Sequence, residues 1–328
     1  MITRRSFLYG STLSVLGAAL PVFQAKADHD GHLISGSPAG SFGTTLAERL
    51  LPIFTEQAHL DYALEIISDG NTRLASKTVK ESKPDGATIL QAVSASMCLL
   101  PNVYQDIEYD PIADFSPLAL MGDYTYALAV GPLVPPSVRT VDNYLDWVSD
   151  NPDFRDIGIT LYGSQGHLAG LMLARHKEIA LRMQAYSHTG AVITDMLNKE
   201  LAATIFVSGR VTSRRSEGQL RALAVTSRER LQAWPQIKTF TEQGVDMNIN
   251  GWIGWFAPAN LSASTTRSLL ARIYRMQQSP DYIDLQKRQL LTQVSLEPHQ
   301  IAQRINDEKA YYSKLISDYK VSRIERNT

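Results

Sequence analysis

The feature that most constrains the fold of this chain is a repeated alternation between two kinds of segment. Short apolar, β-branched runs are separated by stretches in which apolar residues recur with helical spacing. In 46–54, for example, Leu46, Leu50, Ile53 and Phe54 fall on one helical face. Strands that alternate with helices predict an α/β architecture with mostly parallel sheets. The expected strands are 33–35, 64–68, 87–93, 127–130, 157–161, 181–185, 203–207 and 222–226.

The same pattern runs through two parts of the chain, which predicts two α/β domains, each with its own sheet. A chain of 328 residues is long enough for both. Two amphipathic segments near the C-terminus, 264–278 and 298–320, are expected to be helices that cover the first domain. We expect residues 28–129 and 250–328 to form one domain and 130–249 the other, joined by short crossings because no low-complexity linker separates them.

Residues 1–27 have the pattern of an export signal. Arg4 and Arg5 precede a short apolar stretch, and the segment ends in small residues at 25–27, as signal peptidase requires. The run TRRSFL resembles a twin-arginine signal, and an ordinary secretory signal that contains two arginines is the alternative. The apolar stretch is too short for a stable membrane span. We therefore expect a mature protein that begins at Asp28 and resides in the periplasm of a bacterium.

Charge and cysteine content exclude several classes of function. The 32 basic residues nearly balance the 33 acidic ones, so the net charge of −1 lacks the basic surplus of a nucleic-acid binder. Cys98 is the only cysteine and has no Cys or His partner at metal-ligand spacing, which favours a buried apolar role. We expect neither a metal nor a cofactor. The polar segment 28–32 is expected to be a mobile terminus.

Three turns rich in Gly, Ser and Thr each follow a predicted strand and precede a predicted helix. They span 37–45, 163–167 and 187–191. Free N–H groups at a helix N-terminus favour an anion, and glycine lets the backbone approach a ligand closely. Each turn alone also fits an ordinary helix cap. Three of them without GxGxxG or a P-loop favour a carboxylate over a nucleotide. The residues predicted to bind the ligand are Gly40, Ser41, Phe42, Gly43, Thr44, Ser164, His188, Thr189, Gly190 and Ala191.

Hydrolytic chemistry is a weaker interpretation of the same residues. Ser164, His167 and Asp195 are the residue types of a catalytic triad. The segment 162–166, however, lacks the first glycine of the GxSxG nucleophile elbow. Ser164 and His167 would also share one cap turn, which favours Ser164 as an N-cap or ligand donor. No catalytic residue is therefore assigned, and the chain is expected not to be an enzyme.

A set of short motifs in a fixed order carries a family resemblance over the whole mature chain. The motifs are Pro38-Ala39-Gly40, Pro84-Asp85-Gly86, Tyr109-Asp110-Pro111, Gly163-Ser164, Tyr186 with Asp195, the run 218–227, and Trp252, Gly254 and Phe256 with 257–259. The chain resembles the solute-binding proteins of tripartite tricarboxylate transporters, the Bug or TctC-like family. The resemblance implies a type II periplasmic-binding-protein-like fold in which two α/β domains close on a small carboxylate ligand. It also implies that the protein, expected to be a monomer, delivers that ligand to membrane permease subunits. A ligand-sensing receptor for a membrane signalling partner is the alternative function.

The chain departs from the pattern of this family at several ligand turns. Ser41 stands where a second glycine is usual, and Thr44 where an aspartate is usual. The usual Gly-Ala-Gly-Gly stretch is 69–72, Asp-Gly-Asn-Thr, and His188 replaces a glycine. Phe42 and His188 add bulk to the two lips of the cleft, which indicates a ligand with an aromatic or apolar portion. A His188 ring that reaches the cleft would either donate to a ligand carboxylate in its protonated form or stack on an aromatic ring, and in the first case binding would weaken as pH rises. A solvent-exposed loop residue without a role in binding is the alternative.

Overall fold

The computed structural model describes residues 29–160, 162–186, 188–215 and 220–324. The expected export signal, 1–27, and the expected first mature residue, Asp28, lie outside this part of the chain. Within it, no helix is both long and apolar enough to cross a membrane.

Two groups of strands make up the sheet, and each is parallel at its outer side. In the first half of the molecule β1 pairs in parallel with β2 and β3. In the second half β5 pairs in parallel with β6 and β7. The bounds are β1 Gly31–Ser35, β2 Tyr62–Ile66, β3 Thr88–Val93, β5 Asp156–Ile159, β6 Arg182–Ala185, β7 Ala203–Val207 and β8 Arg221–Val225.

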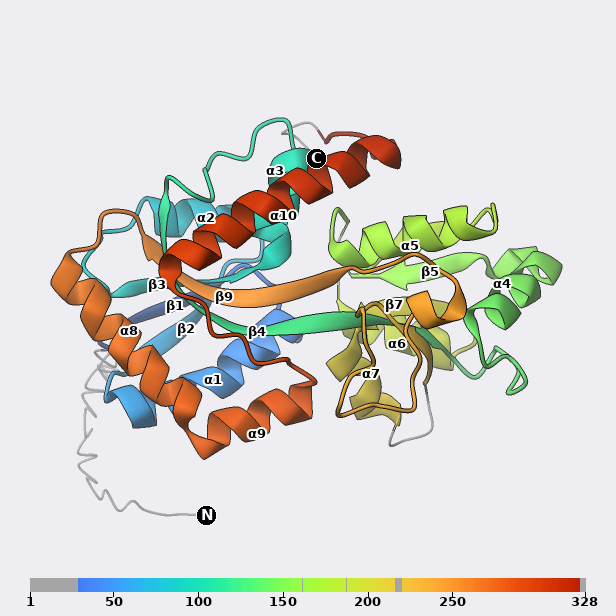
Figure 1. The fold of residues 1–328 in the computed structure, drawn as a ribbon, viewed down its shortest axis with the longest axis horizontal. Helices are drawn as coiled ribbons and strands as arrows, with labels where there is room; N and C mark the ends of the chain where they lie inside the picture. Colours follow the sequence, from blue (N-terminus) through green and yellow to red (C-terminus); the bar gives the residue numbers. More distant parts are fainter. Residues whose placement is uncertain (1–28, 161, 187, 216–219, 325–328) are drawn as a thin grey trace, which may run out of the picture.

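Two long strands, β4 (Phe115–Val130) and β9 (Asn250–Pro258), join the two halves. Figure 1 shows both running across the middle of the molecule. β4 pairs antiparallel with β9 over 115–125 and then with β7 and β8 over 126–130. The strand order is β2-β1-β3-β9-β4-β7-β5-β6, with β8 also paired to β4. The expectation of two mostly parallel sheets is wrong in this respect, because β4 and β9 make every pairing in the centre antiparallel.

Helices cover the sheet of each half (Figure 1). In the first half α1, α8 and α9 pack together, and α10 packs on β4, α3 and the π-helix η1. The bounds there are α1 Phe42–Ala58, α2 Arg73–Lys80, η1 Ala95–Leu99, α3 Leu100–Val103, α8 Ala263–Gln278, α9 Pro280–Gln289 and α10 Pro298–Asp318. In the second half they are α4 Val141–Asp150, η2 Pro152–Phe154, α5 Gln165–His176, α6 Thr189–Leu197, α7 Ser208–Arg215 and η3 Thr241–Gln243.

The apolar face of α1 explains why this helix forms and where it packs. Leu46, Leu50 and Phe54 are fully buried at helical spacing, and Ser41 caps the helix at its start. The Phe54 ring meets the Trp255 ring edge to face at 5.2 Å between centroids. Burial of such side chains against β9 supplies the main favourable free energy of the first half.

The expected mobile terminus at 28–32 is wrong for its last residues. Gly31 and His32 belong to β1. Ahead of them, the ring of His29 lies 2.8 Å from the carboxylate of Asp61, and the Asp61 N–H donates to the carboxylate of Asp30 at 2.8 Å. These contacts continue the strand pairing, so the chain enters β1 as part of the sheet.

Candidate functional site

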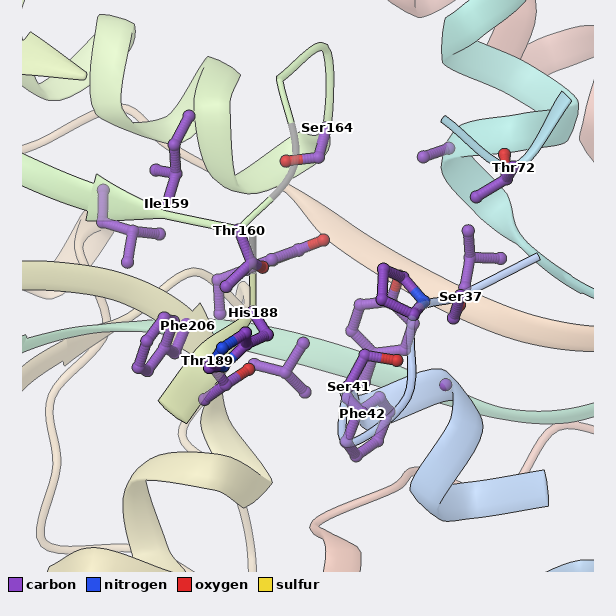
Figure 2. Close-up of a pocket in the computed structure, with 18 residues that line it drawn as sticks. Ser37, Ser41, Phe42, Thr72, Ile159, Thr160, Ser164, His188, Thr189 and Phe206 are labelled. Atoms are coloured by element: carbon purple, nitrogen blue, oxygen red, sulfur yellow. The ribbon is translucent and has the colours of Figure 1, made fainter. Parts of the chain in front are cut away.

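A cavity lies between the two halves, beside β4 (Figure 2). All three turns that the sequence singled out contribute to its wall. The strands β3, β4, β5 and β7 form most of the rest, and Thr72 before α2, Ala95 of η1 and Thr160 after β5 complete it. The lining residues are Ser37, Pro38, Ser41, Phe42, Gly43, Thr72, Val93, Ala95, Tyr124, Tyr126, Ile159, Thr160, Ser164, His188, Thr189, Ile205, Phe206 and Val207.

Six of the ten predicted ligand residues line this cavity and four do not. Ser41, Phe42 and Gly43 reach it from the first turn, Ser164 from the second, and His188 and Thr189 from the third. The residues that stay outside its lining are Gly40, Thr44, Gly190 and Ala191.

The first turn presents the start of α1 to the cavity. Ser41 Oγ accepts the N–H of Thr44 at 3.3 Å and so caps the helix. Thr44 itself is fully buried, and its hydroxyl donates to the carbonyl of Ser37 at 2.6 Å. That bond fixes the shape of the turn. The N–H groups of Phe42 and Gly43, in the first turn of α1, have no acceptor among the described residues. They are the backbone donors that an anion in the cavity would meet.

The second turn is built around Ser164, which caps α5. Its Oγ accepts the backbone N–H of His167 at 3.2 Å. The His167 ring takes a different partner, because its Nδ1 accepts the N–H of Gly163 at 3.3 Å. Burial lowers the pKa of His167 to about 4, so the ring is neutral at physiological pH.

A hydrolase triad is not assembled by these residues. In the described part of the chain no hydrogen bond joins the Ser164 hydroxyl to the His167 ring. The Asp195 carboxylate instead accepts the hydroxyl of Tyr186 at 2.8 Å. The geometry of Ser164 is that of a helix cap rather than of an activated nucleophile.

His188 caps α6 in the third turn, because its Nδ1 accepts the N–H of Ala191 at 3.2 Å. Since Nδ1 is engaged by the backbone, Nε2 is the ring nitrogen left to meet a ligand in the cavity. Donation from His188 to a ligand carboxylate stays a prediction.

An aromatic wall, which sequence reasoning missed, closes the cavity along β4. Tyr124 and Tyr126 lie two residues apart, so both side chains point to the same face of the strand, while Thr125 points away and bonds Ser208 at 2.8 Å. Burial raises the pKa of Tyr124 to about 12, so its hydroxyl stays protonated. The alternation of aromatic and polar residues at 124–126 is typical of a strand, but the expected strand begins only at 127.

Thr72 is a second lining residue that the sequence did not assign. It has φ +71°, a left-handed conformation that is unfavourable for a β-branched residue, and it directly follows Gly70 and Asn71, which are also left-handed. It is 5% exposed, and its hydroxyl oxygen is buried without a hydrogen-bond partner among the described residues. The backbone of 70–72 therefore has the shape that glycines adopt readily.

Two contacts join the halves at the rim of the cavity. Arg210 of α7 donates to the carbonyl of Gly40 and, at 3.0 Å, to the hydroxyl of Thr45. The side-chain amide of Asn71 donates to the carbonyl of Tyr162 at 3.2 Å. Each contact links the first half to the second, so the two halves are in direct contact beside the cavity in this structure.

Within the described residues, no group of three or more His, Cys, Asp or Glu side chains is placed to hold a metal ion. Cys98 is fully buried, and burial raises the pKa of its thiol, as the small apolar role requires.

Comparison with known proteins identifies the family. Residues 67–321 match the family described as tripartite tricarboxylate transporter family receptor, TctC. The chain is 25% identical over 313 residues to protein BugT of Bordetella pertussis, covering 94% of each chain. Among solved structures it resembles the periplasmic binding protein BugD, with a TM-score of 0.82 and 20% identity over 90% of this chain and 98% of that one. It also resembles an R. palustris protein solved with adipate, with a TM-score of 0.83 and 18% identity over 90% and 98% of the two chains.

These similarities confirm the expected fold of two α/β domains around a cleft, as in periplasmic binding proteins. The family match covers most of the sequence and includes β4, β9 and the second and third turns. The chain belongs to the tripartite tricarboxylate transporter receptor family, TctC.

Proposed function

We propose that this chain is an exported solute-binding protein. It captures a small carboxylate in the cavity between its halves and delivers it to the permease subunits of a tripartite tricarboxylate-type transporter. The observation that carries the proposal is the convergence of three capped helix N-termini, those of α1, α5 and α6, on one cavity. Helix N-termini combine free N–H donors with a dipole that favours negative charge.

Carboxylate binding in this cavity depends on backbone N–H groups and hydroxyls. The donors that line the cavity include the N–H groups of Phe42 and Gly43 and the side chains of Ser41, Ser164 and Thr189. Hydrogen bonds to a charged ligand contribute roughly 1.5–3 kcal/mol each. Adipate bound to an R. palustris protein of this fold supports a carboxylate as the ligand.

Delivery requires that bound and empty forms differ. We propose that residues 28–129 with 250–328 move as one domain and 130–249 as the other, about the crossing strands β4 and β9. A ligand that contacts both α1 and α6 binds the closed form better and shifts the population towards it. The permease subunits would recognise that closed form, with the receptor acting as a monomer in the periplasm after removal of residues 1–27.

No catalytic step belongs to this function. The Ser164 and His167 side chains serve as a cap and a turn contact, and Asp195 is bonded to Tyr186. The ligand would therefore leave the protein chemically unchanged.

The test compares two serine helix caps, one at the cavity and one away from it. Ser41 caps α1 at the cavity, and Ser262 caps α8 on the exposed surface, accepting the N–H of Thr265 at 3.1 Å. Each Ser→Ala variant should lose about 1 kcal/mol of stability with its cap. Calorimetric titration with a panel of organic acids should show weaker binding for Ser41→Ala and wild-type binding for Ser262→Ala. If no organic acid binds, or if the two variants bind alike, the proposal fails.

A further inference from the structure

The wall of the cavity divides into a polar part and an apolar part. The polar part consists of the Ser and Thr hydroxyls, the His188 imidazole and the backbone of Gly43. The apolar part is larger and consists of aliphatic side chains and the rings of Phe42, Tyr124, Tyr126 and Phe206, and the two tyrosines each add a hydroxyl. A ligand that fills the cavity therefore meets both polar donors and hydrocarbon.

Four aromatic rings belong to the apolar part. Phe42 and Tyr124 meet edge to face with centroids 5.4 Å apart, and Tyr124 meets Tyr126 in the same way at 5.6 Å. Phe206 comes from the end of β7 in the second half, and Figure 2 shows it across the cavity from Phe42. Edge-to-face contacts are the arrangement that aromatic groups prefer. A further ring placed between these walls would extend a pattern that the protein already contains.

Charged side chains are missing from the part of the wall that the described residues form. None of the 18 lining residues is Asp, Glu, Lys or Arg. The guanidinium at the rim, that of Arg210, bonds Gly40 and Thr45. One carboxylate can be held by N–H groups and hydroxyls at the polar part. A second carboxylate placed between the rings of Phe42 and Phe206 would lie against hydrocarbon without a cation among the described lining residues, and burial of a charge in such surroundings is strongly unfavourable.

We propose that the ligand is an aromatic monocarboxylate. Its carboxylate lies at the starts of α1 and α6, and its ring lies among Phe42, Tyr124 and Phe206. This inference rests on the proposed function, because it assumes that an organic acid binds in this cavity. It goes further by excluding acids whose second carboxylate would have to enter the apolar part.

Calorimetric titration of the mature protein with four acids tests the inference. Benzoate and cyclohexanecarboxylate differ in aromaticity, while benzene-1,4-dicarboxylate adds a second carboxylate to benzoate, and adipate is a flexible dicarboxylate. Benzoate should bind about 2- to 12-fold more tightly than cyclohexanecarboxylate, the range that one aromatic contact provides. It should bind more tightly than either dicarboxylate by at least about tenfold.

The outcomes separate this inference from the proposed function. Tighter binding of either dicarboxylate, or equal binding of benzoate and cyclohexanecarboxylate, would overturn the aromatic monocarboxylate while leaving carboxylate capture intact. Failure of all four acids, together with the wider panel, would overturn both.

Two variants on one helix provide the matched control. Phe42 and Phe54 are both buried on α1, but only Phe42 lines the cavity. Phe42→Leu should reduce the preference for benzoate over cyclohexanecarboxylate to near equality, whereas Phe54→Leu should keep the wild-type preference. Phe206→Leu repeats the test from the opposite wall if Phe42→Leu fails to fold. An unchanged preference in every folded cavity variant would contradict the proposed ring position.

Discussion

Thr72 is the residue at which the conformation of the chain conflicts most clearly with its side chain. Its φ of +71° is unfavourable for a β-branched residue, and its buried hydroxyl has no partner among the described residues. It also precedes α2 without capping it, since its side chain makes no bond to the helix start. Thr72 lowers the stability of the fold and lines a ligand cavity, which indicates a role in shaping that cavity.

Replacing Thr72 with glycine should therefore stabilise the protein. Thr72→Gly relieves the left-handed strain, which costs roughly 1–2 kcal/mol, and removes the unpartnered hydroxyl. Urea unfolding should give a free energy of unfolding about 1 kcal/mol higher than wild type. Thr140, which caps α4 by accepting the N–H of Asn143 at 3.1 Å, is the control. Thr140→Gly should destabilise the protein, and a destabilised Thr72→Gly would show that the strain is absent.

The residues of the cap turns could be predicted from the sequence because a helix cap is encoded locally. A Ser at a turn before a helical pattern is enough to identify Ser41 and Ser164. The wall opposite could not be predicted in this way. Tyr124 and Phe206 come from strands β4 and β7, and only the pairing of those strands brings the two side chains to one cavity.

At the scale of elements, α7 and α1 are linked across the cleft by Arg210. Its bonds to the Gly40 carbonyl and the Thr45 hydroxyl connect the second half to the first ligand turn. These two hydrogen bonds form only when the halves are together, so they favour the closed form. The ligand and this link therefore stabilise the same state.

Removing the link should weaken ligand binding without unfolding the protein. Arg210→Ala should raise the dissociation constant of the preferred acid by about tenfold, corresponding to one charge-assisted hydrogen bond of roughly 1.5 kcal/mol. Arg230, which pairs with Glu242 within the second half, gives the control. Calorimetry should show wild-type affinity for Arg230→Ala. Equal affinities in the wild type and Arg210→Ala would mean that the link does not contribute to closure.

Elements with a regular period could be predicted, while elements that depend on tertiary partners could not. The helices near 264–278 and 298–320 are present because their apolar spacing is sufficient to specify them. β4, in contrast, extends from Phe115, although Pro117, Gly122 and Asp123 weaken the strand pattern. Asp123 is tolerated there because Arg304 of α10 bonds both of its carboxylate oxygens, at 2.9 and 3.1 Å.

For the molecule as a whole, the buried ring of His167 makes stability depend on pH. Burial lowers its pKa from 6.5 in the unfolded chain to about 4 in the folded protein. Between these values the unfolded state binds more protons, so stability is full above pH 6.5 and falls as pH drops towards 4. The loss should reach about 3 kcal/mol at most.

Urea unfolding from pH 7 to pH 4 checks this dependence. His167→Gln keeps an acceptor for the Gly163 N–H but removes the titrating ring, so its stability should vary less with pH than that of the wild type. His299→Gln, on the exposed surface of α10, is the control and should follow the wild-type profile. If His167→Gln retained the full wild-type slope, another group would be responsible.

The central claim is that a carboxylate is held between the two halves by helix N-termini. A crystal structure of the mature protein with its preferred acid tests it most directly. The carboxylate oxygens should lie within about 3 Å of the N–H groups of Phe42 or Gly43 and in contact with Ser41, Ser164 or Thr189. An acid bound outside this cavity, or with its carboxylate against Phe206 and away from α1, α5 and α6, would contradict it.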